Sequence, residues 1–236
     1  MGPMAERGHG GVGESVKVSL DCLFLKGQGG RMPSTATGRV SQEERSQSMR
    51  QRLLDATVAC LVDYGWSGTS TVLVSERAGV SRGAQLHHFP TKNHLVLAAI
   101  EHLWESRGEA YRAAITGLGD GPDRVRRVVH ILGEQFSSDL YVAALELWVA
   151  ARSDEALHAA VIQLEHRIGS GVHRLTVEAL GVDESVPGVR ELVQATLDLV
   201  RGLGLANTLT DDSARRRRIL DRWAVTLDHE LKELRG

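Results

Sequence analysis

The residue types best suited to chemistry gather in one short segment, SRGAQLHH, at positions 81–88. Arg and Gln side chains can each make two hydrogen bonds to the edge of a base in the DNA major groove. The small residues Gly83 and Ala84 stand between them, so a helix of this sequence could lie deep in that groove. We therefore predict that this segment reads DNA. Its exposed side chains are expected to be Arg82, Gln85, His87 and His88.

A longer pattern, from Thr69 to Leu95, would position this segment. Ser70 stands where a first helix would begin, and a Ser side chain there accepts a hydrogen bond from a free backbone N–H group. Gly79 can adopt the left-handed backbone that ends a helix, and Ser81 can cap the next one. A helix, a short turn containing glycine and a second helix predict a helix-turn-helix.

The second helix is expected to end at Pro90, because the residue before a proline avoids helical angles. Thr91 can then cap a long helix that begins with Lys92. The first turn of a helix carries free N–H groups that favour an anion. We therefore expect Lys92 to hold a phosphate of the DNA backbone beside them.

Residues in and around this region form an ordered set. It runs Gly65-Trp66, Thr69-Ser70, Ala78-Gly79-Val80-Ser81, Gly83, His88-Phe89 and Lys92. The set resembles the DNA-binding head of the TetR/AcrR family of bacterial regulators, over about residues 47–107. The resemblance implies an all-helical homodimer that binds a palindromic operator, with a variable C-terminal domain whose small-molecule ligand usually releases the DNA. DNA contacts are then expected from Ser70, Ser81, Arg82, Gly83, Ala84, Gln85, Leu86, His87, His88 and Lys92.

One departure from the family pattern lies inside the second helix. Members usually have an apolar residue followed by Tyr where this chain has Gln85-Leu86, and that Tyr commonly touches DNA. Leu86 cannot donate a hydrogen bond. Two outcomes are open: Gln85 takes over the contact, or Leu86 fills the core position left by its neighbour.

The chain of 236 residues allows one large domain or two small ones. We expect residues 1–40 to be a flexible tail, because nine of the 25 glycines fall before residue 39 and little periodic pattern is present. The alternative is a basic arm that reaches the minor groove through Arg39, Arg45 and Arg50. A DNA-binding domain is expected over 47–107, with a first helix that begins near Ser41 and is closed by Gly65. Trp66 should then fill the core of that three-helix head.

The rest of the chain predicts helices throughout. The expected ranges are 95–115, 123–137, 140–152, 155–180, 187–209 and 211–234. No segment shows the sustained alternation of apolar and polar residues that is typical of a strand. The predicted fold class is therefore all-α, with an N-terminal helix-turn-helix domain of three helices followed by a larger ligand-binding and dimerisation domain over 108–236.

The last two predicted helices each carry a broad apolar face. The first face consists of Val189, Leu192, Val193, Ala195, Thr196, Leu199 and Val200, and the second of Leu220, Trp223, Ala224, Leu227 and Leu231. Gly202 and Gly204 would permit close helix approach. Two such helices from each of two chains could form a four-helix interface, which we expect from the resemblance. The alternative is that both faces belong to the core of one chain.

A ligand pocket is expected inside the C-terminal domain, between apolar helices with a few polar groups. Its candidate lining residues are Trp104, Tyr111, Phe136, Tyr141, Trp148 and His173. Each of these residues has an alternative as ordinary core.

Composition and motifs exclude several other classes. The formal net charge is −2, so the whole chain is not a bulk binder of polyanions, and no apolar run is long enough to span a membrane. The two cysteines give no disulfide framework, which fits the cytoplasm. Neither a catalytic motif nor a metal or cofactor site is expected, since His158, His166 and His173 lack the helical spacing of metal ligands. The rivals to a ligand-responsive repressor are a helical ligand- or protein-binding dimer that no longer binds DNA and an all-helical enzyme.

Overall fold

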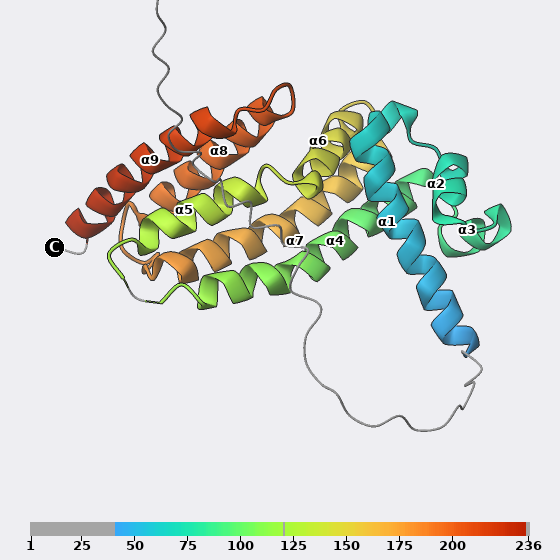
Figure 1. Cartoon of the computed structure of the whole chain (residues 1–236), viewed down its shortest axis with the longest axis horizontal. Coiled ribbons are helices and arrows are strands. Elements are labelled where there is room, and N and C mark those ends of the chain that lie inside the picture. Colours follow the sequence, from blue (N-terminus) through green and yellow to red (C-terminus); the bar gives the residue numbers. More distant parts are fainter. Residues whose placement is uncertain (1–40, 120, 235–236) are drawn as a thin grey trace, which may run out of the picture. The chain divides into compact units, whose positions relative to one another are not determined.

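The computed structural model describes residues 41–119 and 121–234. Within these residues every regular element is an α-helix, as predicted (Figure 1). The helices are α1 (Gln42–Gly68), α2 (Thr71–Ala78), α3 (Arg82–His88), α4 (Lys92–Thr116), α5 (Arg124–Gln135), α6 (Asp139–Ala151), α7 (Glu155–Leu180), α8 (Val189–Asn207) and α9 (Ser213–Glu233). The predicted tail over 1–40, with Arg39, lies outside the described residues.

The helix-turn-helix forms as the capping residues predicted. Ser70 Oγ accepts a hydrogen bond from the Leu73 N–H at 3.1 Å, and Ser81 Oγ accepts one from the Ala84 N–H at 3.3 Å. Gly79 ends α2 in the left-handed conformation with φ 61°. Helices α1, α2 and α3 pack on a core of buried apolar side chains that includes Leu54, Val74 and Phe89. This core fixes how α3 is presented.

Helix α1 is interrupted at Gly65, where φ is 64° and ψ is −176°. That backbone region is essentially restricted to glycine, so the expectation that Gly65 closes the first helix is confirmed. Trp66 begins one further turn, but the prediction that it fills the core of the head is wrong. Its ring is half-buried in a second cluster, where Leu61 of α1 and Ile100 of α4 meet α6 and α7.

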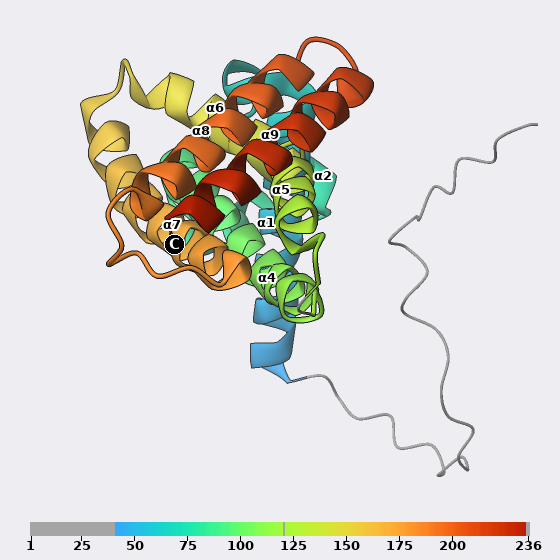
Figure 2. The same ribbon diagram turned by 90° about the vertical axis from the view of Figure 1, so that its left-hand side faces the viewer.

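The C-terminal helices pack around a third apolar cluster. It draws on α4 to α9 and includes Leu132, Leu197 and Leu227. Helix α4 runs from the helix-turn-helix alongside α7, and α8 lies beside α9 (Figure 1; the turned view is Figure 2). Helix α4 therefore belongs both to the head and to the body that follows it.

Candidate DNA-reading helix and ligand cavity

Helix α3 presents one face to solvent. Arg82 and Gly83 are exposed, and one turn later Leu86 and His87 are exposed as well. Residues four apart share a face of a helix, so Arg82 and Leu86 form one edge of this surface, and Gly83 and His87 form the other. His88 is half-buried, and burial lowers the pKa of its ring, with His87 and Arg50 adding to the effect.

Gln85 does not lie on this face, and the prediction that it is exposed is wrong. The side chain is 0% exposed, and Nε2 donates a hydrogen bond to the Phe89 carbonyl oxygen at 2.6 Å. Gln85 shares its side of the helix with Phe89, four residues later, which is itself part of the head core. Leu86 is 46% exposed, so the alternative in which it fills a core position is wrong as well. The outward position therefore offers an apolar surface and no hydrogen-bond donor.

Lys92 has an intramolecular partner where we expected a phosphate contact. Its Nζ donates to the carbonyl oxygen of Trp66 and stands over the Trp66 ring, 4.1 Å from the ring centroid. Burial lowers the pKa of this ammonium group. The side chain thus joins the start of α4 to the end of α1, and it does not extend freely towards a ligand of the head.

A carboxylate of α6 contacts the same place, the junction between the end of α1 and the start of α4. Glu146 Oε2 accepts a hydrogen bond from the Trp66 backbone N–H at 2.6 Å. Because Gly65 interrupts α1, this N–H stands at the start of a new turn, where N–H groups lack helical partners and favour a negative charge. Trp66 is therefore held by Lys92 of α4 and Glu146 of α6. Glu146 was not predicted from the sequence, because no local motif marks it.

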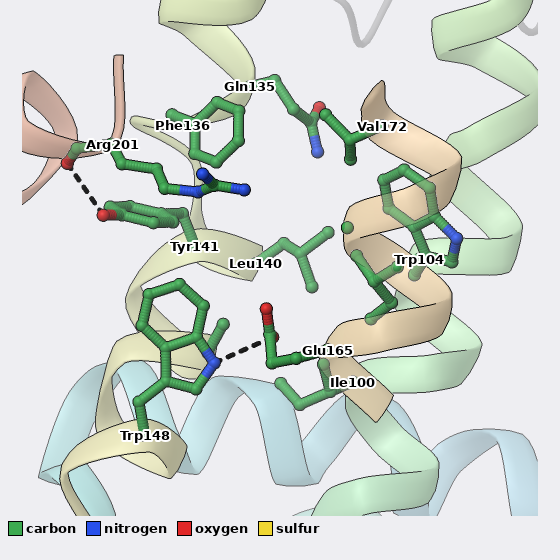
Figure 3. A pocket seen from close by; sticks show the side chains of 13 residues that line it. Ile100, Trp104, Gln135, Phe136, Leu140, Tyr141, Trp148, Glu165, Val172 and Arg201 are labelled. Atoms are coloured by element: carbon green, nitrogen blue, oxygen red, sulfur yellow. Dashed lines mark hydrogen bonds between the residues drawn. The ribbon is translucent and has the colours of Figure 1, made fainter. Parts of the chain in front are cut away.

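A cavity lies within the body, and side chains of α4 to α8 line it (Figure 3). About 540 Å³ of empty space is present, counted with its opening to solvent. The lining residues are Ile100, Trp104, Gln135, Phe136, Leu140, Tyr141, Ala144, Trp148, Glu165, Ile168, Gly169, Val172 and Arg201. A mostly apolar wall with a few polar groups is typical of a small-molecule site.

The structure brings together four of the six predicted lining residues, namely Trp104, Phe136, Tyr141 and Trp148. Tyr111 is buried in the body core instead, and burial raises its pKa to about 12. His173 belongs to a different, surface hollow, where its ring contacts Glu184 through Nε2 and Gln194 through Nδ1. These two assignments to the cavity are therefore wrong.

The charged lining residues were not predicted. Glu165 Oε1 accepts a hydrogen bond from the Trp148 indole N–H at 2.8 Å. Burial raises the pKa of this carboxyl group, against the opposing effects of that hydrogen bond and of Arg201. A signal was present in the sequence, because Glu165 interrupts a stripe with apolar Val161 and Ile168 at helical spacing.

Most of the predicted dimer faces belong to the core of the chain itself. Val189, Val193, Thr196, Val200, Leu220, Ala224, Leu227 and Leu231 are all buried without a second chain. A Cβ atom at Gly204 would lie 1.9 Å from the Phe136 carbonyl oxygen, so this glycine permits a close approach within the chain. The alternative of ordinary core thus holds for these positions. Exposed apolar residues remain along and just beyond α8, notably Leu205 and Leu209.

No group of three or more His, Cys, Asp or Glu residues within 41–119 and 121–234 is placed to hold a metal ion. None of the helices in that part of the chain is both long and apolar enough to cross a membrane.

Comparisons with known proteins agree with this architecture. The family model for bacterial regulatory proteins of the tetR family matches residues 53–99. The helix-turn-helix transcriptional regulator CymR of Pseudomonas putida is 31% identical over 187 residues, which cover 77% of this chain and 90% of that protein. The regulator BetI of Pectobacterium carotovorum is 29% identical over 175 residues, covering 72% of this chain and 88% of that one.

Solved structures show the same fold. A member of the TetR family from Streptomyces coelicolor A3 superposes with a TM-score of 0.54 and 25% sequence identity, covering 74% of this chain and 97% of the other. The matched relatives are named as transcriptional regulators and not as enzymes. Their similarity extends well beyond the helix-turn-helix into the helices that line the cavity. The chain therefore belongs to the TetR family and is a DNA-binding transcriptional regulator of the helix-turn-helix type.

Proposed function

We propose that the chain acts in the cytoplasm as a homodimeric repressor, and that a small molecule entering the cavity releases it from a palindromic operator. One observation carries this proposal: two helices contact both the cavity and the junction with the head. Helix α4 holds Lys92 at the junction and Trp104 at the cavity. Helix α6 holds Glu146 at the junction, between the cavity residues Tyr141 and Trp148.

The proposed DNA surface is the outward face of α3 with the ends of α2 and α3. Arg82 is the candidate for bonding a base edge, and Leu86 with Ala84 offers apolar contact to a thymine methyl group. Further proposed contacts come from Ser70, Ser81, Gly83, His87 and His88. Gln85 is left out because its amide is buried, and Lys92 is proposed to position α4 instead.

The proposed division of the chain places DNA binding in residues 47–107 and ligand binding with dimerisation in 108–236. The two parts share the apolar cluster that contains Leu61, Ile100 and Leu147, so a movement of one part can be transmitted to the other through this packing. We propose that α8 and α9 form the dimer interface through the apolar residues left exposed, such as Leu205. A dimer would place two α3 helices about one DNA turn, roughly 34 Å, apart.

Ligand binding can change DNA affinity only through a difference in affinity between two states of the protein. We propose that these states differ in how α4 and α6 hold Trp66. A ligand that fits the cavity in one arrangement of the two helices favours that arrangement. The spacing of the two heads would then no longer match the operator.

The test is binding to the promoter DNA that flanks the gene of this chain, measured by fluorescence anisotropy at two salt concentrations. We expect a discrete complex with two chains, whose affinity falls steeply with salt because basic side chains displace counterions. Arg82→Ala should weaken the complex and relax its sequence preference. If no complex forms at low salt, and a selection from genomic fragments enriches none, the chain is not a regulator that acts by binding DNA.

A further inference from the structure

The cavity contains a carboxyl group in an apolar wall. Glu165 lies on α7 among residues that face the cavity with it, Ile168 and Val172. Its carboxyl group points towards the Trp148 indole, which supplies a neutral hydrogen-bond donor (Figure 3). In the part of the chain that the structure describes, no Lys, Arg or His side chain forms an ion pair with it. A carboxylate that is removed from water without a cationic partner is costly.

The other charged lining residue is already engaged. Arg201 pairs with Asp198 through a contact of 2.8 Å between Nη1 and Oδ1. Its guanidinium group also stands over the Phe136 ring, 5.5 Å from the ring centroid. Arg201 lowers the pKa of Glu165, but burial raises that pKa more strongly. The cavity therefore has a carboxyl group without an ion-pair partner among the described residues, and a guanidinium group that is already paired with Asp198 and stacked on Phe136.

Four aromatic rings surround the same space. The Phe136 and Tyr141 rings lie 5.4 Å apart at 73°, and the Tyr141 and Trp148 rings lie 6.2 Å apart at 87°. Trp104 contributes a further ring from α4. The faces of aromatic rings attract cations, most strongly where water is excluded.

We propose that the effector of this regulator is an organic cation with an apolar body. Its positive charge would face Glu165 and the surrounding rings, and its apolar part would contact Ile100 and Leu140. This inference rests on the proposed function, because it names the ligand class of the same cavity. An anionic ligand is disfavoured, since it would meet the carboxylate of Glu165, which has no ion-pair partner in the described part of the apolar wall.

The experiment measures direct binding to the full chain, without DNA, by calorimetry. The probes are choline and benzyltrimethylammonium, each paired with an uncharged carbon isostere (3,3-dimethylbutan-1-ol and neopentylbenzene). An aromatic anion, 4-tert-butylbenzoate, completes the set. We expect at least one cation to bind about tenfold or more tightly than its isostere, which corresponds to about 1.4 kcal/mol. The anion should bind more weakly than that cation.

The variant Glu165→Gln removes the charge and keeps an oxygen that can accept from Trp148, so it should fold normally. It should lose most of the preference for the cation over its isostere, and the preference that remains comes from the aromatic rings. The matched control is Glu178→Gln, an exposed position on the same helix, which should retain the preference. Equal binding of cation and isostere by the unaltered chain, tighter binding of the anion, or no binding of either cation would each overturn the inference.

This assay is separable from the test of the proposed function. DNA binding is measured on the same preparations by anisotropy, with and without the probes. A cation preference in a chain that never binds DNA would uphold the ligand class and refute the repressor. A salt-sensitive DNA complex in a chain without that preference would do the reverse.

Discussion

The hydrogen bond between Glu146 and Trp66 should account for a measurable part of the stability of this chain. It joins a carboxylate oxygen to a backbone N–H at 2.6 Å, and the N–H has no helical partner because Gly65 interrupts α1. Hydrogen bonds to charged groups contribute about 1.5–3 kcal/mol, and the half-buried setting favours the lower part of that range. We therefore expect Glu146→Ala to lower the free energy of unfolding by about 2 kcal/mol.

Urea denaturation, followed by circular dichroism, measures this loss. In a chain of this size about 2 kcal/mol corresponds to a decrease in Tm of roughly 4–8 °C. Glu146→Gln keeps an acceptor without the charge, so its loss should be roughly half as large. Glu105→Ala, at an exposed position of α4, is the matched control and should change stability by less than about 0.5 kcal/mol.

A second readout locates the effect. Hydrogen exchange of the Trp66 amide should accelerate in Glu146→Ala, while amides in the centre of α9 should change only with global stability. If Glu146→Ala is as stable as the Glu105→Ala control and the Trp66 amide stays protected, the hydrogen bond between Glu146 and Trp66 does not stabilise the junction. The role proposed for α6 in linking the cavity to the head would then lose its structural basis.

Three other outcomes follow from the structure. Gly65→Ala should lower the free energy of unfolding by about 1–3 kcal/mol in the same denaturation assay, because the backbone at φ 64° and ψ −176° strains a residue with a Cβ atom. Unchanged stability would show that the interruption of α1 is not required. Arg82→Ala should weaken the free energy of operator binding, measured by anisotropy, by about 1–3 kcal/mol and leave the Tm unaltered. If the variant binds the operator as tightly as the unaltered chain, α3 does not belong to the DNA surface. The affinity for benzyltrimethylammonium should rise as the pH is raised above the ordinary titration range of a Glu side chain, since burial raises the pKa of Glu165 and a cation binds its ionised form. Burial raises the pKa of the facing Tyr141 phenol, so this group does not titrate in that range. A pH dependence that persists in Glu165→Gln would contradict this cause.

The order of elements and the position of the helix-turn-helix could be predicted because they depend on local chemistry. Ser70 and Ser81 cap helices, and Gly79 ends one, through contacts with residues only a few positions away. The same holds for Gly65, whose backbone conformation is open to glycine and strained for other residues. Helix boundaries in the body were likewise close to those observed, since apolar spacing and turn residues mark them.

The site depended on contacts between residues that are distant in the chain. The side on which Gln85 lies was decided by the packing of α3 on the head core, which buried an amide and left Leu86 outside. The apolar faces of α8 and α9 would have the same sequence pattern in either case, covered by a second chain or by α5 and α7 of the same chain. Lys92 and Glu146 meet at Trp66 only because α1, α4 and α6 converge there.

The sequence by itself therefore determined the fold class, the family and the position of the helix-turn-helix, because each depends on residues within one or two helical turns of one another. The tertiary structure decided which charges face the cavity and how the head is joined to it. The burial of Glu165 on α7, and its hydrogen bond from the Trp148 indole of α6, depend on neighbours from several helices. A periodic pattern assigns a side chain to a face of its own helix, but it does not say which other helix that face will meet.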